Sequence, residues 1–127
     1  NPAQRRNQCR RTIAEILRHL MLKRELDEEA KDMAAPLVFV LRGIAETIDG
    51  STEAWEKRNY YLKADRFRLD WEWAGMSAAK LRKAFAIEDW GTIALTSALI
   101  AQKLNKVVIP QRHRLGSPWV GAARLLK

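Results

Sequence analysis

The stretch WEKRNYYLKADRFRLDWEW (residues 55–73) holds six of the ten aromatic residues of this chain, together with five Lys or Arg. At about 100° per residue, a helix through this stretch has two apolar faces instead of one. The first face contains rings and alanines without a charge, and we predict that it packs in the core: Tyr60, Ala64, Phe67, Trp71 and Ala74. The opposite face mixes rings, leucines and guanidinium groups: Trp55, Arg58, Leu62, Arg66, Leu69 and Trp73.

The second face has three interpretations. A central helix with neighbours on both sides would bury the stems of Arg58 and Arg66 while their charges reach solvent. A subunit interface would use the same residue types, because Trp and Arg are the enriched anchors of interfaces. Bases of a nucleic acid could also stack on Trp55 or Trp73. Since a surface helix of a small bundle needs only one apolar face, we predict that this face contacts another polypeptide segment.

Helical periodicity continues outward from this stretch in both directions. Asp27 is a good N-cap, Pro36 predicts a kink or a short break, and DGST (49–52) predicts a helix end. Ser77 is expected to cap a short helix, and the helix opened by Glu88 and Asp89 is expected to be the most buried. We therefore expect helices over residues 8–24, 28–48, 52–74, 78–86, 88–104 and 118–126.

These features predict an all-α fold in which residues 1–127 form a single helical domain. The domain would be a compact bundle of five or six helices, with a basic Gly/Pro loop, QRHRLGSPW, at residues 111–119. A length of 127 residues with 47% hydrophobic and 30% charged residues suits one folded core. The most apolar run, TIALTSALIA, is too short to cross a bilayer, so no membrane partner is expected. A single cysteine, Cys9, excludes an intrachain disulfide and suits the reducing cytoplasm.

Positive charge is concentrated at the two ends of the sequence. The net charge is +8, residues 1–24 hold seven Lys or Arg against one acid, and residues 91–127 hold six and no acid. Residues 25–53 are acidic between them. A basic surface of this kind is typical of a protein that binds a polyanion.

Chemical motifs are scarce. His19 and His113 lack a second His or Cys at metal-ligand spacing, and none of the six glycines forms a phosphate-binding loop. We therefore predict no catalytic residues, no metal, no cofactor and no enzymatic activity. The remaining enzymatic interpretation is a small enzyme whose active site the sequence does not reveal.

Binding of nucleic acid, either single-stranded or as an RNA–DNA hybrid, is the function that this charge pattern favours. Such contacts would go to phosphates, so they would be sensitive to salt and largely independent of sequence. The predicted primary residues are Arg5, Arg6, Arg10, Arg11, Arg112, His113 and Arg114, with Lys80 and Lys83 as secondary contributors.

Three segments carry a resemblance to a known family: QCRRTIAEILRHL (8–20), AAKLRKAF (78–85) and QRHRLG (111–116). In its general layout the chain resembles the small helical subunits of multi-subunit CRISPR interference complexes. The resemblance implies a non-catalytic subunit of a ribonucleoprotein that stabilises a guide–target hybrid or a displaced strand. It also implies contacts with other protein subunits, including copies of itself. The alternative is a helical adaptor or assembly factor whose basic ends bind an acidic protein.

Overall fold

The computed structural model describes residues 1–104, and every regular element in this range is an α-helix. The helices are α1 (Pro2–Leu20), α2 (Glu28–Glu56), α3 (Tyr61–Ala86) and α4 (Trp90–Lys103). The all-α prediction is confirmed for this range, with four helices where the sequence predicted five. The predicted helix over residues 118–126 and the basic loop over residues 111–119 lie outside the described residues.

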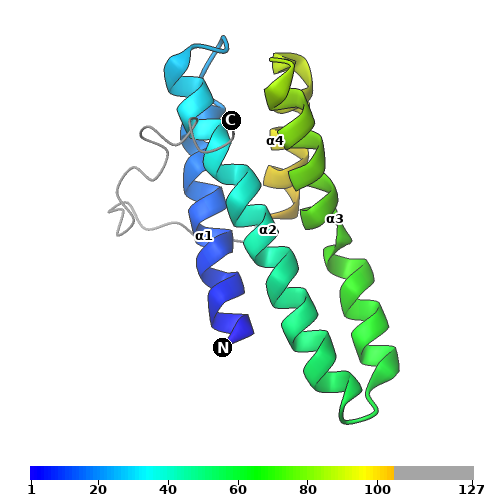
Figure 1. The fold of residues 1–127 in the computed structure, drawn as a ribbon. Helices are drawn as coiled ribbons and strands as arrows, with labels where there is room; N and C mark the ends of the chain where they lie inside the picture. The colour runs from blue at the N-terminus through cyan, green and yellow to red at the C-terminus, as the bar shows by residue number, and fades with distance from the viewer. Residues whose placement is uncertain (105–127) are drawn as a thin grey trace.

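The long helices α2 and α3 form an antiparallel hairpin around which the two shorter helices pack (Figure 1). Helix α1 lies mainly against α2, and α4 lies mainly against α3. Helix α4 covers the C-terminal half of α3, so the half of α3 next to the α2–α3 turn has no such cover (Figure 1). None of the helices in residues 1–104 is both long and apolar enough to span a membrane.

The helix starts follow capping chemistry. The Asp27 carboxylate accepts a hydrogen bond of 2.7 Å from the backbone N–H of Ala30, which confirms the predicted cap of α2. The Asp89 carboxylate accepts one of 3.1 Å from the backbone N–H of Thr92 and caps α4 in the same way. Helix α1 begins earlier than predicted because Asn1 caps it, with its side chain accepting from the backbone N–H of Ala3 at 2.9 Å.

Two predicted helix boundaries were wrong. Residues 49–52 do not end α2, because the Thr52 hydroxyl donates to the carbonyl oxygen of Ile48 at 2.9 Å and stays within the helix. Ser77 is not a cap, because α3 runs without interruption through Gly75 and Ser77. Burial of Ala74, on the same stretch of α3, favours this continuous helix over a local break. Helix α2 likewise runs through the buried Pro36 without a break.

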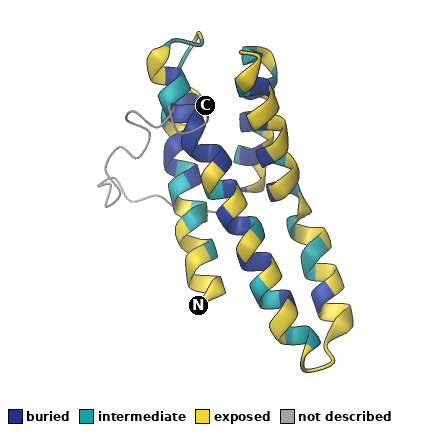
Figure 2. Ribbon diagram, in the orientation of Figure 1, coloured by how far each residue is buried: buried dark blue, intermediate teal, exposed yellow. Residues whose placement is uncertain are grey.

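The core lies where α1, α2 and the C-terminal half of α3 meet, with α4 closing it (Figure 2). The apolar stripes of α1 and α2 are buried, whereas α3 contributes mainly alanines, which let its backbone come close to α2. The predicted core residues Phe67 and Trp71 are only half-buried at the edge of the core. Large side chains with less than 2% exposure include Ile13, Ile16, Leu37, Leu41, Ile44, Leu81, Ile93 and Ile100.

Helix α4 is not the most buried element, contrary to the prediction. Its Ile93 and Ile100 are buried, but Leu95 and Leu99 are 64% and 48% exposed. The reason is that α4 packs on one side only, mainly against α3, while α2 has α1 and α3 on different sides. The central element of the described fold is therefore α2.

Candidate functional site

The turn between α2 and α3 brings the ends of the two long helices together. Asn59 has a positive φ of 65°, a backbone conformation that Asn tolerates better than most residues. The backbone N–H of Tyr60 donates to the carbonyl oxygen of Trp55 at 2.9 Å, which closes the turn. An ion pair of 2.6 Å between Arg68 and Glu56 joins the two helices just beyond it. Trp55, the last ring of α2, therefore lies beside the first turns of α3.

Four half-buried rings form a row that starts at this turn, and we call it the ring row: Trp55, Phe67, Trp71 and Trp73. Trp55 meets Phe67 edge-on, with ring centroids 4.9 Å apart and planes at 79°. Phe67 and Trp71 are 6.2 Å apart, and Trp71 stacks on Trp73 at 5.7 Å. Aromatic pairs at such distances attract one another beyond simple burial. The row gives the poorly covered half of α3 a cohesive surface.

Cations from two helices lie over the ring row. The guanidinium of Arg6 in α1 is 4.7 Å from the centroid of Phe67, and that of Arg10 is 5.6 Å from Trp71. From α3 itself, the Lys63 ammonium lies 4.4 Å from the Trp55 centroid. Each distance is within the range of a cation–π attraction. The row is therefore coated by positive charge on the side that faces α1.

The two arginines of α1 are held in different ways. Arg6 also donates to the hydroxyl oxygens of Thr47 and Ser51 in α2, at 3.3 and 3.4 Å. Burial and the neighbouring charge of Arg10 lower the pKa of Arg6. The Nε atom of Arg10 is buried with no hydrogen-bond partner among the described residues. Arg6 is thus a structural link between three helices, and Arg10 retains an unused donor.

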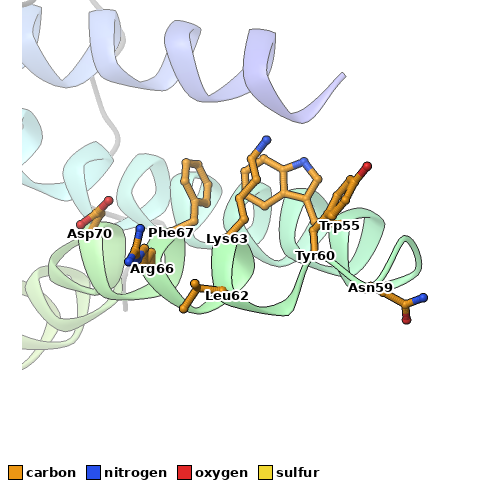
Figure 3. Close-up of a pocket in the computed structure, with 8 residues that line it drawn as sticks. All are labelled: Trp55, Asn59, Tyr60, Leu62, Lys63, Arg66, Phe67 and Asp70. Atoms are coloured by element: carbon orange, nitrogen blue, oxygen red, sulfur yellow. The ribbon is translucent and has the colours of Figure 1, made fainter.

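Next to the turn lies an open hollow of about 800 Å³, lined by residues of the α2–α3 hairpin. Figure 3 shows Trp55, Lys63 and Phe67 projecting toward the side of α1, whereas Leu62 extends away from it. At the surface of the hollow, Tyr60 and Leu62 are 53% and 66% exposed. The lining combines ring faces, two cations, an amide and a carboxylate: Trp55, Asn59, Tyr60, Leu62, Lys63, Arg66, Phe67 and Asp70.

The structure places the predicted nucleic-acid-binding residues in several settings. Arg5 is in an ion pair of 2.7 Å with Glu46, and Arg6 and Arg10 lie over the ring row. Arg11 is exposed and has no ion pair within the described residues. The two predicted residues in α3 are exposed near the opposite end of the bundle from the α2–α3 turn (Figure 1): Lys80 and Lys83. Arg112, His113 and Arg114 lie outside the described residues.

Much of the positive charge that suggested a polyanion partner also lies outside the described residues. Residues 1–104 hold 18 Lys or Arg and all 15 Asp or Glu, a net charge of +3, and the other five cations are in residues 105–127. A ligand of the described helices must therefore use local cations rather than a broad positive field. The hollow and the ring row supply such cations beside aromatic rings.

The predicted partner face divides into two parts. Trp55 and Trp73 are half-buried in the ring row, whereas Arg58, Leu62, Arg66 and Leu69 are exposed. The prediction that Tyr60 lies in the core was wrong. Tyr60 belongs to the turn before α3. The sequence pattern did not single out Asn59, Lys63 or Asp70, which all line the hollow. The tolerance of Asn for a left-handed backbone, ahead of two tyrosines, was the available signal for the turn.

Within residues 1–104, no group of three or more His, Cys, Asp or Glu residues is placed to hold a metal ion. Comparison with known proteins found no matching family model, no similar curated protein and no similar solved structure.

Proposed function

We propose that this chain is a non-catalytic protein that binds single-stranded nucleic acid through the hollow beside the α2–α3 turn. One observation carries the proposal: the exposed ring of Tyr60, the half-buried ring of Trp55 and the ammonium of Lys63 line one open hollow. Stacking on aromatic side chains beside backbone-binding cations is how proteins hold single strands with little sequence preference.

Six of the eight lining residues have a role in this proposal. A base stacks against Tyr60 or Trp55, whose rings supply the apolar surface. Lys63 and Arg66 contact the phosphates on either side of that base, since both are exposed at the hollow. Asn59 and Asp70 offer an amide and a carboxylate to base edges, which would give a modest base preference at one position. Arg6 and Arg10 contribute positive potential from α1 while they remain bound to the ring row.

The resemblance to small helical subunits of CRISPR interference complexes offers one setting for such a site. In that setting the chain would be one protein subunit of a cytoplasmic ribonucleoprotein, holding a displaced strand or the exposed edge of a guide–target hybrid. The hollow accommodates an unstacked base, which favours the displaced strand. The hybrid remains a second ligand to test.

Fluorescence anisotropy tests the proposal, with the full chain and two labelled oligonucleotides of unrelated sequence, each as RNA and as DNA. We expect binding that weakens as salt rises. Trp55→Leu should lower the affinity about 5- to 150-fold, because stacking on an aromatic ring contributes about 1–3 kcal/mol per base. Lys63→Gln should lower it for both sequences and reduce the log–log salt slope by about one.

Arg24→Gln is the matched control. Arg24 is exposed in the α1–α2 connection, at the opposite end of the bundle from the hollow (Figure 1), and has no ion pair among the described residues. This variant removes the same charge as Lys63→Gln, so it separates a local contact from the effect of net charge. No binding at low salt would contradict the function. Binding that Trp55→Leu and Lys63→Gln leave unchanged would contradict the site.

A further inference from the structure

Helix α3 carries an exposed stripe on the side that faces away from α2, and Figure 2 shows exposed residues along this outer side. Successive members are four and three residues apart in alternation, the spacing of a coiled-coil seam. Leu62, Leu69 and Met76 are 66%, 67% and 59% exposed. Six of its seven members are exposed, and Trp73 is half-buried because it also belongs to the ring row. We call these seven residues the outer stripe: Leu62, Arg66, Leu69, Trp73, Met76, Lys80 and Lys83.

An exposed stripe of this length, apolar from Leu62 to Met76 apart from Arg66 and basic at its C-terminal end, is unusual on a helix of a small bundle. From Leu62 to Lys83 the helix rises by about 32 Å, which is the length of a six-turn helix. Scattered exposed apolar residues need no explanation, but a stripe in coiled-coil register matches the face of a second helix. The geometry therefore fits a helical partner laid along α3.

The charges on the stripe indicate what kind of partner helix would bind to it. Arg66, Lys80 and Lys83 are all exposed and form no ion pair within the described residues. Because Lys80 and Lys83 are one turn apart at the C-terminal end of the stripe, they make a positive end to an apolar seam. A partner helix with acidic residues opposite them would neutralise both cations and bury the seam in one contact.

A second copy of this chain fits less well. In a parallel pair Lys80 and Lys83 would face their own counterparts. In an antiparallel pair centred on Trp73, Arg66 would face Lys80 of the other copy. Both arrangements bring like charges together at a closely packed seam, which opposes association. The acids beside the stripe do not remove this conflict, since Asp65 is already paired with Arg68 at 3.6 Å, and Asp70 and Glu72 lie on the two flanks and not in the seam.

We propose that the outer stripe of α3 binds an acidic amphipathic helix from another protein. Its apolar residues pack against Leu62, Leu69 and Met76, and its Asp or Glu residues lie opposite Lys80 and Lys83. The flank position of Glu72 sets a further condition, because an acid of the partner cannot lie against it. The partner's negative charge is thus concentrated at one end of its apolar seam. Leu62 and Arg66 of the stripe also line the hollow, but the inference is argued from the seam and from Lys80 and Lys83, so it does not rest on the nucleic-acid proposal.

A charge-swap experiment with two synthetic peptides tests this inference. Each labelled helical peptide has about 22 residues, enough to follow the stripe, and carries a leucine seam. The first has glutamates at the end that would face Lys80 and Lys83, and the second has lysines there. Anisotropy of each peptide is measured against the full wild-type chain and against the double variant Lys80→Glu/Lys83→Glu. The Arg24→Glu/Arg42→Glu variant is the control, since both arginines are exposed and lie outside the stripe.

The glutamate peptide should bind the wild-type chain, and the double variant should weaken that binding about tenfold. The lysine peptide should show the reverse preference, while the control variant should behave like the wild-type chain. Leu69→Ser should weaken the binding of both peptides without changing the circular dichroism spectrum or the melting temperature, because Leu69 is exposed in the free chain.

Four results would overturn the inference. The first is equal affinity of the two peptides for both proteins, and the second is no binding of either peptide. The third is a wild-type dimer in sedimentation equilibrium that Leu69→Ser converts to a monomer, which would assign the stripe to a second copy. The fourth is a double variant that loses affinity for single-stranded RNA but not for the glutamate peptide. That result would assign Lys80 and Lys83 to the nucleic-acid surface.

Discussion

Arg6 of α1 lies over the ring of Phe67 of α3, with its guanidinium carbon 4.7 Å from the ring centroid. The contact joins the N-terminal half of α1 to the N-terminal half of α3, beyond the region that α4 covers (Figure 1). A cation and a row of rings here take the place that aliphatic side chains have in the rest of the core. This arrangement leaves aromatic surface close to solvent, which is the condition that a stacking site requires.

Loss of Arg6 should destabilise the fold. We expect Arg6→Ala to lower the free energy of unfolding by about 1–2 kcal/mol, because it removes a cation–π contact and hydrogen bonds to two hydroxyl groups. Arg6→Lys should lower it less, since a cation remains but the planar group is lost. Urea unfolding followed by circular dichroism measures both. Arg11→Ala is the matched control in the same helix, and an equal effect at both positions would contradict the structural role of Arg6.

Burial should separate the effects of substituting two leucines, one in each of the long helices α2 and α3. Leu41→Ala should cost about 2–5 kcal/mol of stability, because the Leu41 side chain has no exposed surface and its loss leaves a cavity. Leu69→Ala should change stability by less than about 0.5 kcal/mol, because Leu69 is 67% exposed. Thermal and urea unfolding of the two variants give the comparison. A large loss in Leu69→Ala would mean that the outer stripe is covered within the chain.

Because α3 is continuous through Gly75 and Ser77, we can predict whether a substitution at each position raises or lowers the stability of the fold. Gly75→Ala should raise stability by about 0.5–1 kcal/mol, because alanine is the better helix former. The added Cβ would meet Ala45 at 4.0 Å, an ordinary contact. Ser77→Ala should be neutral or slightly stabilising in a helix interior. If a break existed at this point, both substitutions would instead lower the melting temperature, since the cap would be lost.

The cap of α4 should make stability depend on pH. Hydrogen bonds from the hydroxyl and the backbone N–H of Thr92 hold the pKa of Asp89 below its ordinary value. Because the folded-state pKa is the lower one, the contribution is fully present above the unfolded-state pKa of about 3.9 and is lost as pH falls through the folded-state pKa. Asp89→Asn keeps a capping oxygen but does not titrate. Wild type should exceed this variant in stability at pH 7 by a margin that shrinks toward pH 3, and a constant margin would contradict the prediction.

The sequence by itself determined the features that depend on neighbours a few residues apart. Helical content, the buried stripes of α1 and α2, and the caps at Asp27 and Asp89 follow from 3–4 spacing and from short-range hydrogen bonding. Two apolar faces of α3 were also predicted, but the prediction wrongly ran one helix through residues 57–60, which form the α2–α3 turn. The segments that pack against each face could not be predicted from the sequence.

Tertiary structure decided the features that depend on which helix lies against which. Helix α4 covers only the C-terminal half of α3, so Phe67 and Trp71 remain half-buried and Leu62 and Leu69 stay exposed. Similarly, α3 continues through Gly75 because burial of the alanines around it offsets a helix propensity cost of about 1 kcal/mol. Local patterns specify a helix and its apolar faces, whereas the free energy of covering each face depends on partners distant in the sequence. That is why the hollow and the ring row, built from α2 and α3 with arginines of α1 over the rings, could be described only from the folded chain.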